Sequence, residues 1–150
     1  MALDFLKRML AAPKGAAAPE DARQAIAAVL VMAARADGDY GADEQAVVDA
    51  ALAGRFKLDP AATRALRLQG EAAEAEAVDI YQFTKAIKDV IPLEERTAIV
   101  EELWRVVLAD GQRDPLEDTL MRQIVDRLGL SPMESALARQ KVQGGGSIQA

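Results

Sequence analysis

Apolar residues recur at helical spacing through most of the chain. Between residues 20 and 142 they return every three or four positions, which places them along one side of an α-helix. No segment alternates between apolar and polar residues over the length of a strand, so we predict no strands. The pattern therefore predicts an all-α fold, a compact bundle of about seven helices whose apolar faces meet in a shared core.

Capping residues predict where several of these helices begin and end. Asp59 and Ser131 each precede a proline, which is typical of a helix start because the side chain caps free amides and proline suits the first turn. Glu134 strengthens the second start, since its carboxylate can reach back to the amide of Ser131. Gly129 predicts the end of the preceding helix, and residues 37–41 predict the turn between the first two helices.

The helix predicted after Pro92 carries the widest apolar stripe. Its apolar residues extend around too much of the circumference for a surface helix. They are Ile99, Val100, Leu103, Trp104, Val106, Val107 and Leu108. We therefore expect this helix to be the core helix of the bundle and Trp104 to be a buried anchor.

Two other features have simple surface interpretations. Tyr40 lies in a turn between charged residues, so we expect it to be exposed and available to a partner. Glu71, Glu74 and Glu76 lie close together in one predicted helix, so we expect them to form a solvated face.

The folded domain is predicted to span residues 20–142. Residues 1–19 are predicted to be a tail and linker, because proline, glycine and alanine interrupt the helical pattern there. The first ten residues lack the apolar stretch of a secretory signal, which predicts a cytoplasmic protein, and contact of so short a tail with a membrane would be weak. Residues 143–150 include three consecutive glycines and are predicted to be a flexible tail.

Composition and charge exclude several classes of function. The sequence contains no Cys and no His, which excludes disulfide frameworks, thiolate nucleophiles, Ser-His triads and the zinc sites that rely on these residues. The formal net charge of −6 disfavours binding to nucleic acid. Metal binding and acid–base chemistry are left mainly to carboxylates, and no residue is predicted to be catalytic.

An acidic turn occurs twice in the chain. The sequence Ala-Asp-Gly at residues 36–38 returns 73 positions later at residues 109–111, and a glutamate, Glu44 or Glu117, follows seven positions after each aspartate. With a gap of one residue, the Leu before each of the prolines Pro60 and Pro132 also aligns. The repeat predicts two pseudo-symmetric halves, and packing them face to face would bring the two acidic turns near each other.

The repeated turn and its flanking residues resemble a known family. The supporting residues are Tyr81, Phe83 and Thr84 in the central helix, and Leu103, Trp104 and Arg105 before the second turn. Over residues 22–141 the chain resembles the tellurite resistance protein TerB family. The resemblance implies a compact all-helical fold of about seven helices with pseudo-symmetric halves. It also implies acidic residues suspected of binding a divalent cation, and a role in tellurite and general stress responses.

The two acidic turns are the candidate metal site. Carboxylate oxygens are ligands that hard cations prefer, so Ca²⁺ or another divalent cation such as Mg²⁺ is the expected ion. The candidate ligands are Asp37, Asp39, Glu44, Asp110, Asp114 and Glu117. The spacing is not that of an EF-hand, because Val48 and Met121 stand where such a loop needs its last glutamate. The turns also differ, since Gln112 stands at the position that matches Asp39.

The same acidic residues have a structural interpretation. Glu44 and Glu117 are expected at the third position of a helix, where a carboxylate can reach back to the N-cap amide. Asp114, which precedes a proline, has the sequence of a helix cap. Capping alone therefore stays an alternative to capping combined with cation binding.

The residues and the resemblance together favour a non-enzymatic helical module. Such a module would bind a divalent cation and act through contacts with other proteins in a tellurite or stress response. One alternative is a structural scaffold in which the acidic turns only cap helices. A second is a metal-dependent enzyme with paired carboxylates, for which the sequence offers no recognisable general base, phosphate loop or nucleophile.

Overall fold

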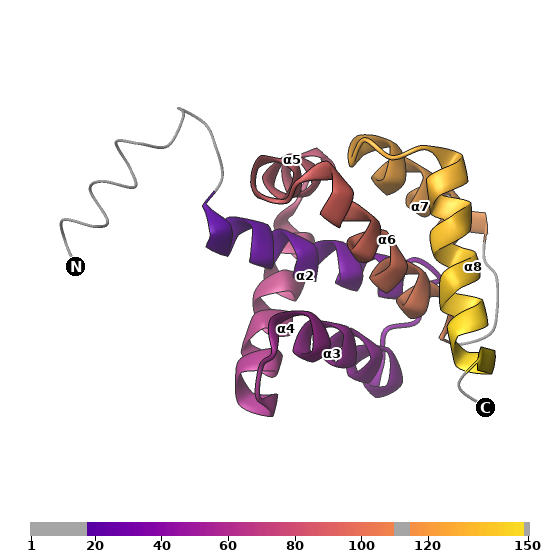
Figure 1. Cartoon of the computed structure of the whole chain (residues 1–150). Helices are drawn as coiled ribbons and strands as arrows, with labels where there is room; N and C mark the ends of the chain where they lie inside the picture. The colour runs from indigo at the N-terminus through magenta and orange to yellow at the C-terminus, as the bar shows by residue number, and fades with distance from the viewer. Residues whose placement is uncertain (1–17, 110–114, 149–150) are drawn as a thin grey trace.

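The described part of the chain is a bundle of seven α-helices. The computed structural model describes residues 18–109 and 115–148, with only the backbone of residues 115–117 and 145–148, and within these ranges its regular elements are helices (Figure 1). The helices are α2 (Pro19–Arg35), α3 (Ala42–Phe56), α4 (Pro60–Glu76), α5 (Tyr81–Val90), α6 (Leu93–Leu108), α7 (Pro115–Arg127) and α8 (Pro132–Ile148). The predicted all-α bundle is confirmed.

Helix α2 lies at the centre of this bundle. It buries ten residues, against seven on α6, and it contacts α3, α4, α5, α6 and α7. Figure 1 shows it passing between α5 on one side and α3 and α4 on the other. The prediction that the helix after Pro92 is the core helix was therefore wrong in part, because α6 belongs to the core but α2 is its centre.

Small side chains explain why α2 is so closely surrounded. Most of its buried residues are alanines, which let neighbouring backbones approach. At Gly70 of α4, an added Cβ atom would lie 2.7 Å from the Cβ of Ala27, closer than two carbon atoms can approach. The prediction for α6 counted large apolar residues. Such a count underestimates the burial of a helix whose buried residues are mostly alanines.

The predicted capping residues cap the helices as expected. The Asp59 carboxylate accepts a hydrogen bond from the Ala62 amide at 2.7 Å. At the start of α8, Ser131 Oγ accepts from the Glu134 amide at 3.1 Å, and Glu134 Oε1 accepts from the Ser131 amide at 2.9 Å. Gly129 has a φ of 83°, which is the left-handed conformation that ends α7.

Trp104 is a buried anchor, as its position on α6 predicts. Trp104 is only 7 % exposed to solvent. Its indole Nε1 donates a hydrogen bond to Ser135 Oγ of α8 at 3.1 Å. The contact joins the two helices through a satisfied polar group, which a buried indole requires.

The structure differs from the prediction at the C-terminal end of the described residues. The backbone of α8 continues as a helix through the three glycines to Ile148, where the sequence predicts a tail from residue 143. Each glycine lowers helix stability by about 1 kcal/mol without breaking the hydrogen-bond pattern, so a packed helix can continue through them. The predicted N-terminal tail lies almost entirely outside the described residues, which begin at residue 18.

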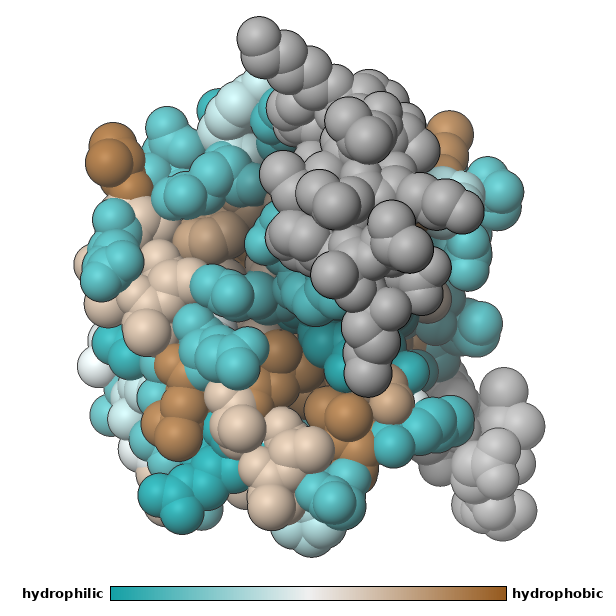
Figure 2. Space-filling model, turned by 90° about the vertical axis from the view of Figure 1, so that its left-hand side faces the viewer, coloured by the Kyte–Doolittle hydropathy of each residue, from teal (hydrophilic) through white to brown (hydrophobic). Residues whose placement is uncertain are grey.

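Apolar side chains on the surface are distributed over several helices. Figure 2, which views the side where α2 begins, shows hydrophobic patches between larger hydrophilic areas. Among the described residues, the exposed large apolar ones are Leu68, Val78, Tyr81, Leu93, Met133 and Leu137. Within the described ranges, no helix combines the length and the apolar content needed to cross a bilayer.

Candidate functional site

The acidic turn between α2 and α3 is ordered by its own carboxylates. Asp37 Oδ1 accepts a hydrogen bond from the Asp39 amide at 2.9 Å, while Gly38 between them has a φ of 90°. Glu44 Oε1 accepts from the Gly41 amide at 2.6 Å, which caps the start of α3. The capping role predicted for Glu44 is therefore confirmed.

A pocket joins this turn to the end of α6. Its volume is about 310 Å³. It is lined by Ala34, Asp37, Asp43, Glu44, Val47, Val106 and Ala109. Ala109 directly precedes Asp110 in the chain, so the first acidic turn faces the segment that leads into the second. The sequence repeat predicts that the two turns lie near each other, and this stays a prediction because the second turn is outside the described residues.

The pocket includes only some of the predicted ligands. Asp37 and Glu44 line it, whereas Asp39 is exposed and is not among the lining residues. Asp43, from the first turn of α3, lies there with them. Within the described residues, no three acidic side chains are grouped closely enough to hold a metal ion.

The other predicted ligands lie outside the part of the chain that the structure describes. Asp110 and Asp114 are not among the described residues, and the side chain of Glu117 is not described either. The six-residue cation site therefore stays a prediction, of which two residues are seen to line one pocket.

A polar network ties the acidic turn to α4. The Tyr40 hydroxyl donates a hydrogen bond to Glu71 Oε2, and Arg67 Nη1 donates to the same oxygen at 2.7 Å. Arg67 Nε donates to Asp49 Oδ1 of α3, also at 2.7 Å. The Arg35 guanidinium lies over the Tyr40 ring, 4.5 Å from its centroid. The buried Arg67 thus joins α3, α4 and the turn, and Arg35 adds a contact from α2 to the turn.

This network overturns two surface expectations. Tyr40 is half-buried and hydrogen-bonded inside the protein, so the prediction of an exposed residue was wrong. Glu71 is paired with Arg67, and Glu74 Oε1 lies 3.3 Å from Arg35 Nε, so two of the three glutamates belong to ion pairs and not to a simple solvated face. The pair of Arg67 and Glu71 follows from helical spacing, whereas Arg35 and Tyr40 come from outside α4 and cannot be inferred from spacing within that helix.

Burial and neighbouring charges shift the pKa values in this network. Burial and the carboxylate of Glu71 raise the pKa of Tyr40 well above its usual range. Burial alone would raise the pKa of Glu71, but the hydrogen bonds from Tyr40 and Arg67 outweigh it and lower that pKa. Glu71 is therefore held as a carboxylate, and Tyr40 as a neutral donor to it.

A buried ion pair joins α3 and α6, the helices that supply two sides of the pocket. Arg55 Nη1 of α3 donates to both carboxylate oxygens of Glu102 on α6, at 3.0 and 3.1 Å. Glu102 is only 8 % exposed, and burial raises its pKa despite the nearby arginine. The same two helices supply Asp43, Glu44 and Val106 to the pocket, while Arg55 lies in the last turn of α3 and does not line it.

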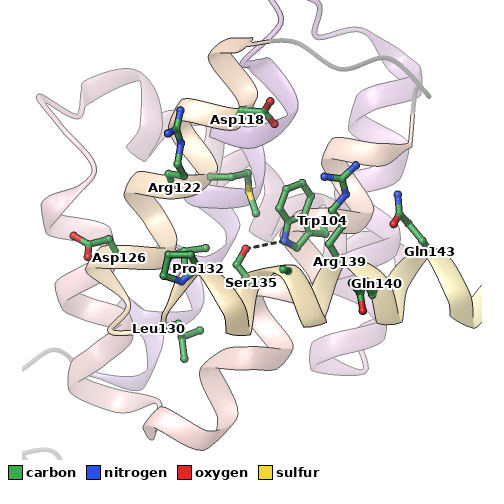
Figure 3. A pocket seen from close by; sticks show the side chains of 13 residues that line it. Trp104, Asp118, Arg122, Asp126, Leu130, Pro132, Ser135, Arg139, Gln140 and Gln143 are labelled. Atoms are coloured by element: carbon green, nitrogen blue, oxygen red, sulfur yellow. Dashed lines mark hydrogen bonds between the residues drawn. The ribbon is translucent and has the colours of Figure 1, made fainter.

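A larger pocket, which the sequence did not predict, lies between α6, α7 and α8. Its volume is about 680 Å³, and Trp104 and Met121 lie among its lining residues (Figure 3). The sequence shows the apolar residues concerned, but their spacing is equally typical of a filled core.

Comparison with known proteins identifies a family. A family model described as Tellurite resistance protein TerB matches residues 23–140. No curated protein and no solved structure matches the chain.

Proposed function

The chain belongs to the tellurite resistance protein TerB family, and we propose that it is a non-enzymatic module that binds a divalent cation beside the α2–α3 turn. The family that the sequence resembles over residues 22–141 is thereby confirmed. In the proposal, the cation orders the acidic turns, and the module acts through contacts with other proteins in a tellurite or stress response. A cytoplasmic location remains a prediction from the sequence.

The pocket beside the turn carries this proposal. Asp37, Asp43 and Glu44 line it together with Ala109, the residue that precedes Asp110. The described acidic side chains are not grouped closely enough to hold an ion by themselves, so the proposal needs ligands from the second acidic turn to complete the site. Several negative charges at one small opening repel each other, and a divalent cation relieves that repulsion. Carboxylates and backbone carbonyls are also the oxygen ligands that Ca²⁺ and Mg²⁺ take.

Capping and cation binding are compatible at this turn. Glu44 uses one oxygen to accept from the Gly41 amide, and a carboxylate has a second oxygen for another partner. The same hydrogen bond favours the competing proposal, a scaffold whose acidic residues only cap helices. The two proposals differ in one measurable respect, which is whether a divalent cation stabilises the protein beyond the effect of ionic strength.

The non-enzymatic assignment rests on the chemistry of the available side chains. The sequence has no His and no Cys, and the residues that line the pocket are acidic, alanine or valine. Carboxylates can act as a general base or a nucleophile, but among the described residues no lysine, arginine, serine, threonine or tyrosine lines this pocket to assist them or to bind a substrate.

Thermal unfolding tests the proposal. Calcium, magnesium or manganese at 100 times the dissociation constant adds about 2.7 kcal/mol to the free energy of unfolding, which raises the melting temperature by several degrees. Sodium chloride at equal ionic strength is the control, because it screens repulsion without occupying a site. A rise that sodium chloride reproduces in full would favour the scaffold and contradict cation binding.

A further inference from the structure

The pocket between α6, α7 and α8 has an apolar floor and polar walls. Trp104 of α6 forms part of the floor, together with Met121 and Val125 of α7. Figure 3 shows Asp118, Arg122 and Asp126 on α7, and Arg139, Gln140 and Gln143 along α8. An apolar floor with a few polar groups at its edge is the usual arrangement of a small-molecule site, and a volume of about 680 Å³ is in the usual range.

Arg139 has an unused donor at the edge of this pocket. Its guanidinium lies beside the indole of Trp104, with its central carbon 5.2 Å from the ring centroid (Figure 3). The Nε–H of Arg139 is buried, and no acceptor for it exists among the described residues. A buried donor without an acceptor costs free energy, which a carboxylate oxygen at this position would recover.

The first half of the chain shows how such an arginine is satisfied. The sequence repeat aligns Arg139 with Arg67, since each is the eighth residue of a helix that begins with proline. Arg67 Nε donates to Asp49, and Arg67 Nη1 donates to Glu71, both at 2.7 Å. Two carboxylates therefore pair with the arginine of the first half.

The repeat replaces both of these carboxylates in the second half. The position that matches Asp49 is Arg122, and the position that matches Glu71 is Gln143. Both replacements line the pocket beside Arg139. The second half thus retains the arginine, while the two residues that would pair with it are a cation and a neutral amide.

The two helical walls of the pocket differ in charge. On α7, Arg122 lies four residues from both Asp118 and Asp126, the spacing at which opposite charges on a helix meet. On the α8 wall, Arg139 is the charged group, with the neutral Gln140 and Gln143 beside it. A negative group would therefore be attracted to the α8 wall and repelled by the carboxylates of α7.

We propose that this pocket binds a small organic carboxylate with an apolar body. The carboxylate accepts hydrogen bonds from Arg139, in the place that Asp49 and Glu71 take relative to Arg67. The apolar body lies against Trp104, Met121 and Val125. This site is separate from the cation pocket beside the α2–α3 turn, so either proposal can fail without the other.

Fluorescence of the full chain tests the proposal directly. Trp104 is the single tryptophan of the sequence and lines the pocket, so its emission reports on the occupant. The probes are phenylbutyrate and its neutral analogue phenylbutyramide, which differ in the carboxylate alone. Phenylbutyrate should change the emission saturably and bind about tenfold more tightly than the amide, because the charged hydrogen bonds are lost in the amide. No saturable change, or equal affinity for both probes, would overturn the proposal.

Three variants identify the group that recognises the carboxylate. Arg139→Gln should abolish the preference for phenylbutyrate, whereas Arg64→Gln, which removes an exposed arginine of α4, should retain it. Gln143→Glu supplies the carboxylate that the first half has at Glu71, so it should compete with the probe and weaken its binding about fivefold or more. Circular dichroism verifies that each variant is folded. If Arg139→Gln does not fold, Gln143→Glu decides, and unchanged binding in that variant would overturn the proposal.

Discussion

The hydroxyl of Tyr40 donates a hydrogen bond to the carboxylate of Glu71, and this contact fixes the acidic α2–α3 turn to α4. Glu71 also accepts from Arg67, whose second partner is Asp49 on α3. The turn is therefore held by contacts with α4, and through Arg67 with α3, in addition to its own capping bonds. The pocket beside the turn depends on this support, because its carboxylates extend from the turn and the first turn of α3.

Tyr40→Phe should lower the free energy of unfolding by about 1 kcal/mol. The change removes the hydroxyl donor while keeping the ring beside Arg35, and Glu71 keeps its bond to Arg67. Urea unfolding measures the loss. A variant as stable as the wild type would show that the hydrogen bond contributes nothing to holding the turn.

Acid should weaken the wild type more steeply than the variant Glu71→Gln. The hydrogen bonds from Tyr40 and Arg67 outweigh burial and lower the pKa of Glu71 below its ordinary value of 4.5. The unfolded state then takes up the proton at a higher pH than the folded state. The stability that Glu71 contributes is therefore present above the ordinary pKa and is lost as the pH falls through the lowered one.

Urea unfolding between about pH 6 and pH 3 measures this difference, since the window spans the ordinary pKa of a glutamate. The wild type should lose more stability across the window than Glu71→Gln does. Parallel pH profiles would mean that the ion pair with Arg67 is absent in solution.

Gly70→Ala and Gly54→Ala should change stability in opposite directions. At Gly70 the new Cβ would meet Ala27 of α2 at 2.7 Å, so the two helices must separate, at a cost of about 1–3 kcal/mol. At Gly54 of α3 a Cβ meets nothing within 4 Å, so alanine should stabilise the helix by about 0.5–1 kcal/mol. Melting temperatures of the two variants provide the comparison, and a tolerated alanine at Gly70 would contradict the close packing of α2 and α4.

Trp104→Ala should be among the most damaging substitutions, at about 3–5 kcal/mol, because it leaves a cavity between α6 and α8. Ser135→Ala is the matched control, since it removes the partner of the indole but leaves the ring in place, and should cost about 1–3 kcal/mol. Denaturant unfolding of both variants separates packing from hydrogen bonding. A loss below about 1 kcal/mol for Trp104→Ala would place the ring on the surface.

Local signals in the sequence were sufficient for the helices and their caps. Asp59, Ser131 and Gly129 act within four residues of their own positions, so their roles can be inferred from neighbouring letters. Long-range pairing cannot be inferred in this way. Arg67 of α4 meets Asp49 of α3, and Tyr40 meets Glu71 over 31 positions of sequence. Because such partners are distant in the sequence, the sequence predicts surface positions for Tyr40 and Glu71.

The candidate site could also be predicted only in part. The repeat of the acidic turn predicts that the two turns lie close together, which stays a prediction, while Asp37 and Glu44 of the first turn line a pocket with Ala109. Which carboxylates face that pocket was not predictable, because Asp39 and Asp43 are both acidic and only the course of the backbone distinguishes them. The pocket beside Trp104 was missed for a related reason, since an apolar stripe does not show whether the space next to it is filled.

Calorimetric titration of the full chain with calcium tests the central claim most directly. Asp43→Asn should weaken binding about tenfold or more, because Asp43 lines the pocket, while Glu76→Gln removes one exposed charge at the end of α4 and should bind as the wild type does. The account predicts saturable heat with about one ion bound per chain, reduced in Asp43→Asn alone. No heat with calcium, magnesium or manganese, or equal binding by Asp43→Asn and the wild type, would contradict a cation site beside the α2–α3 turn.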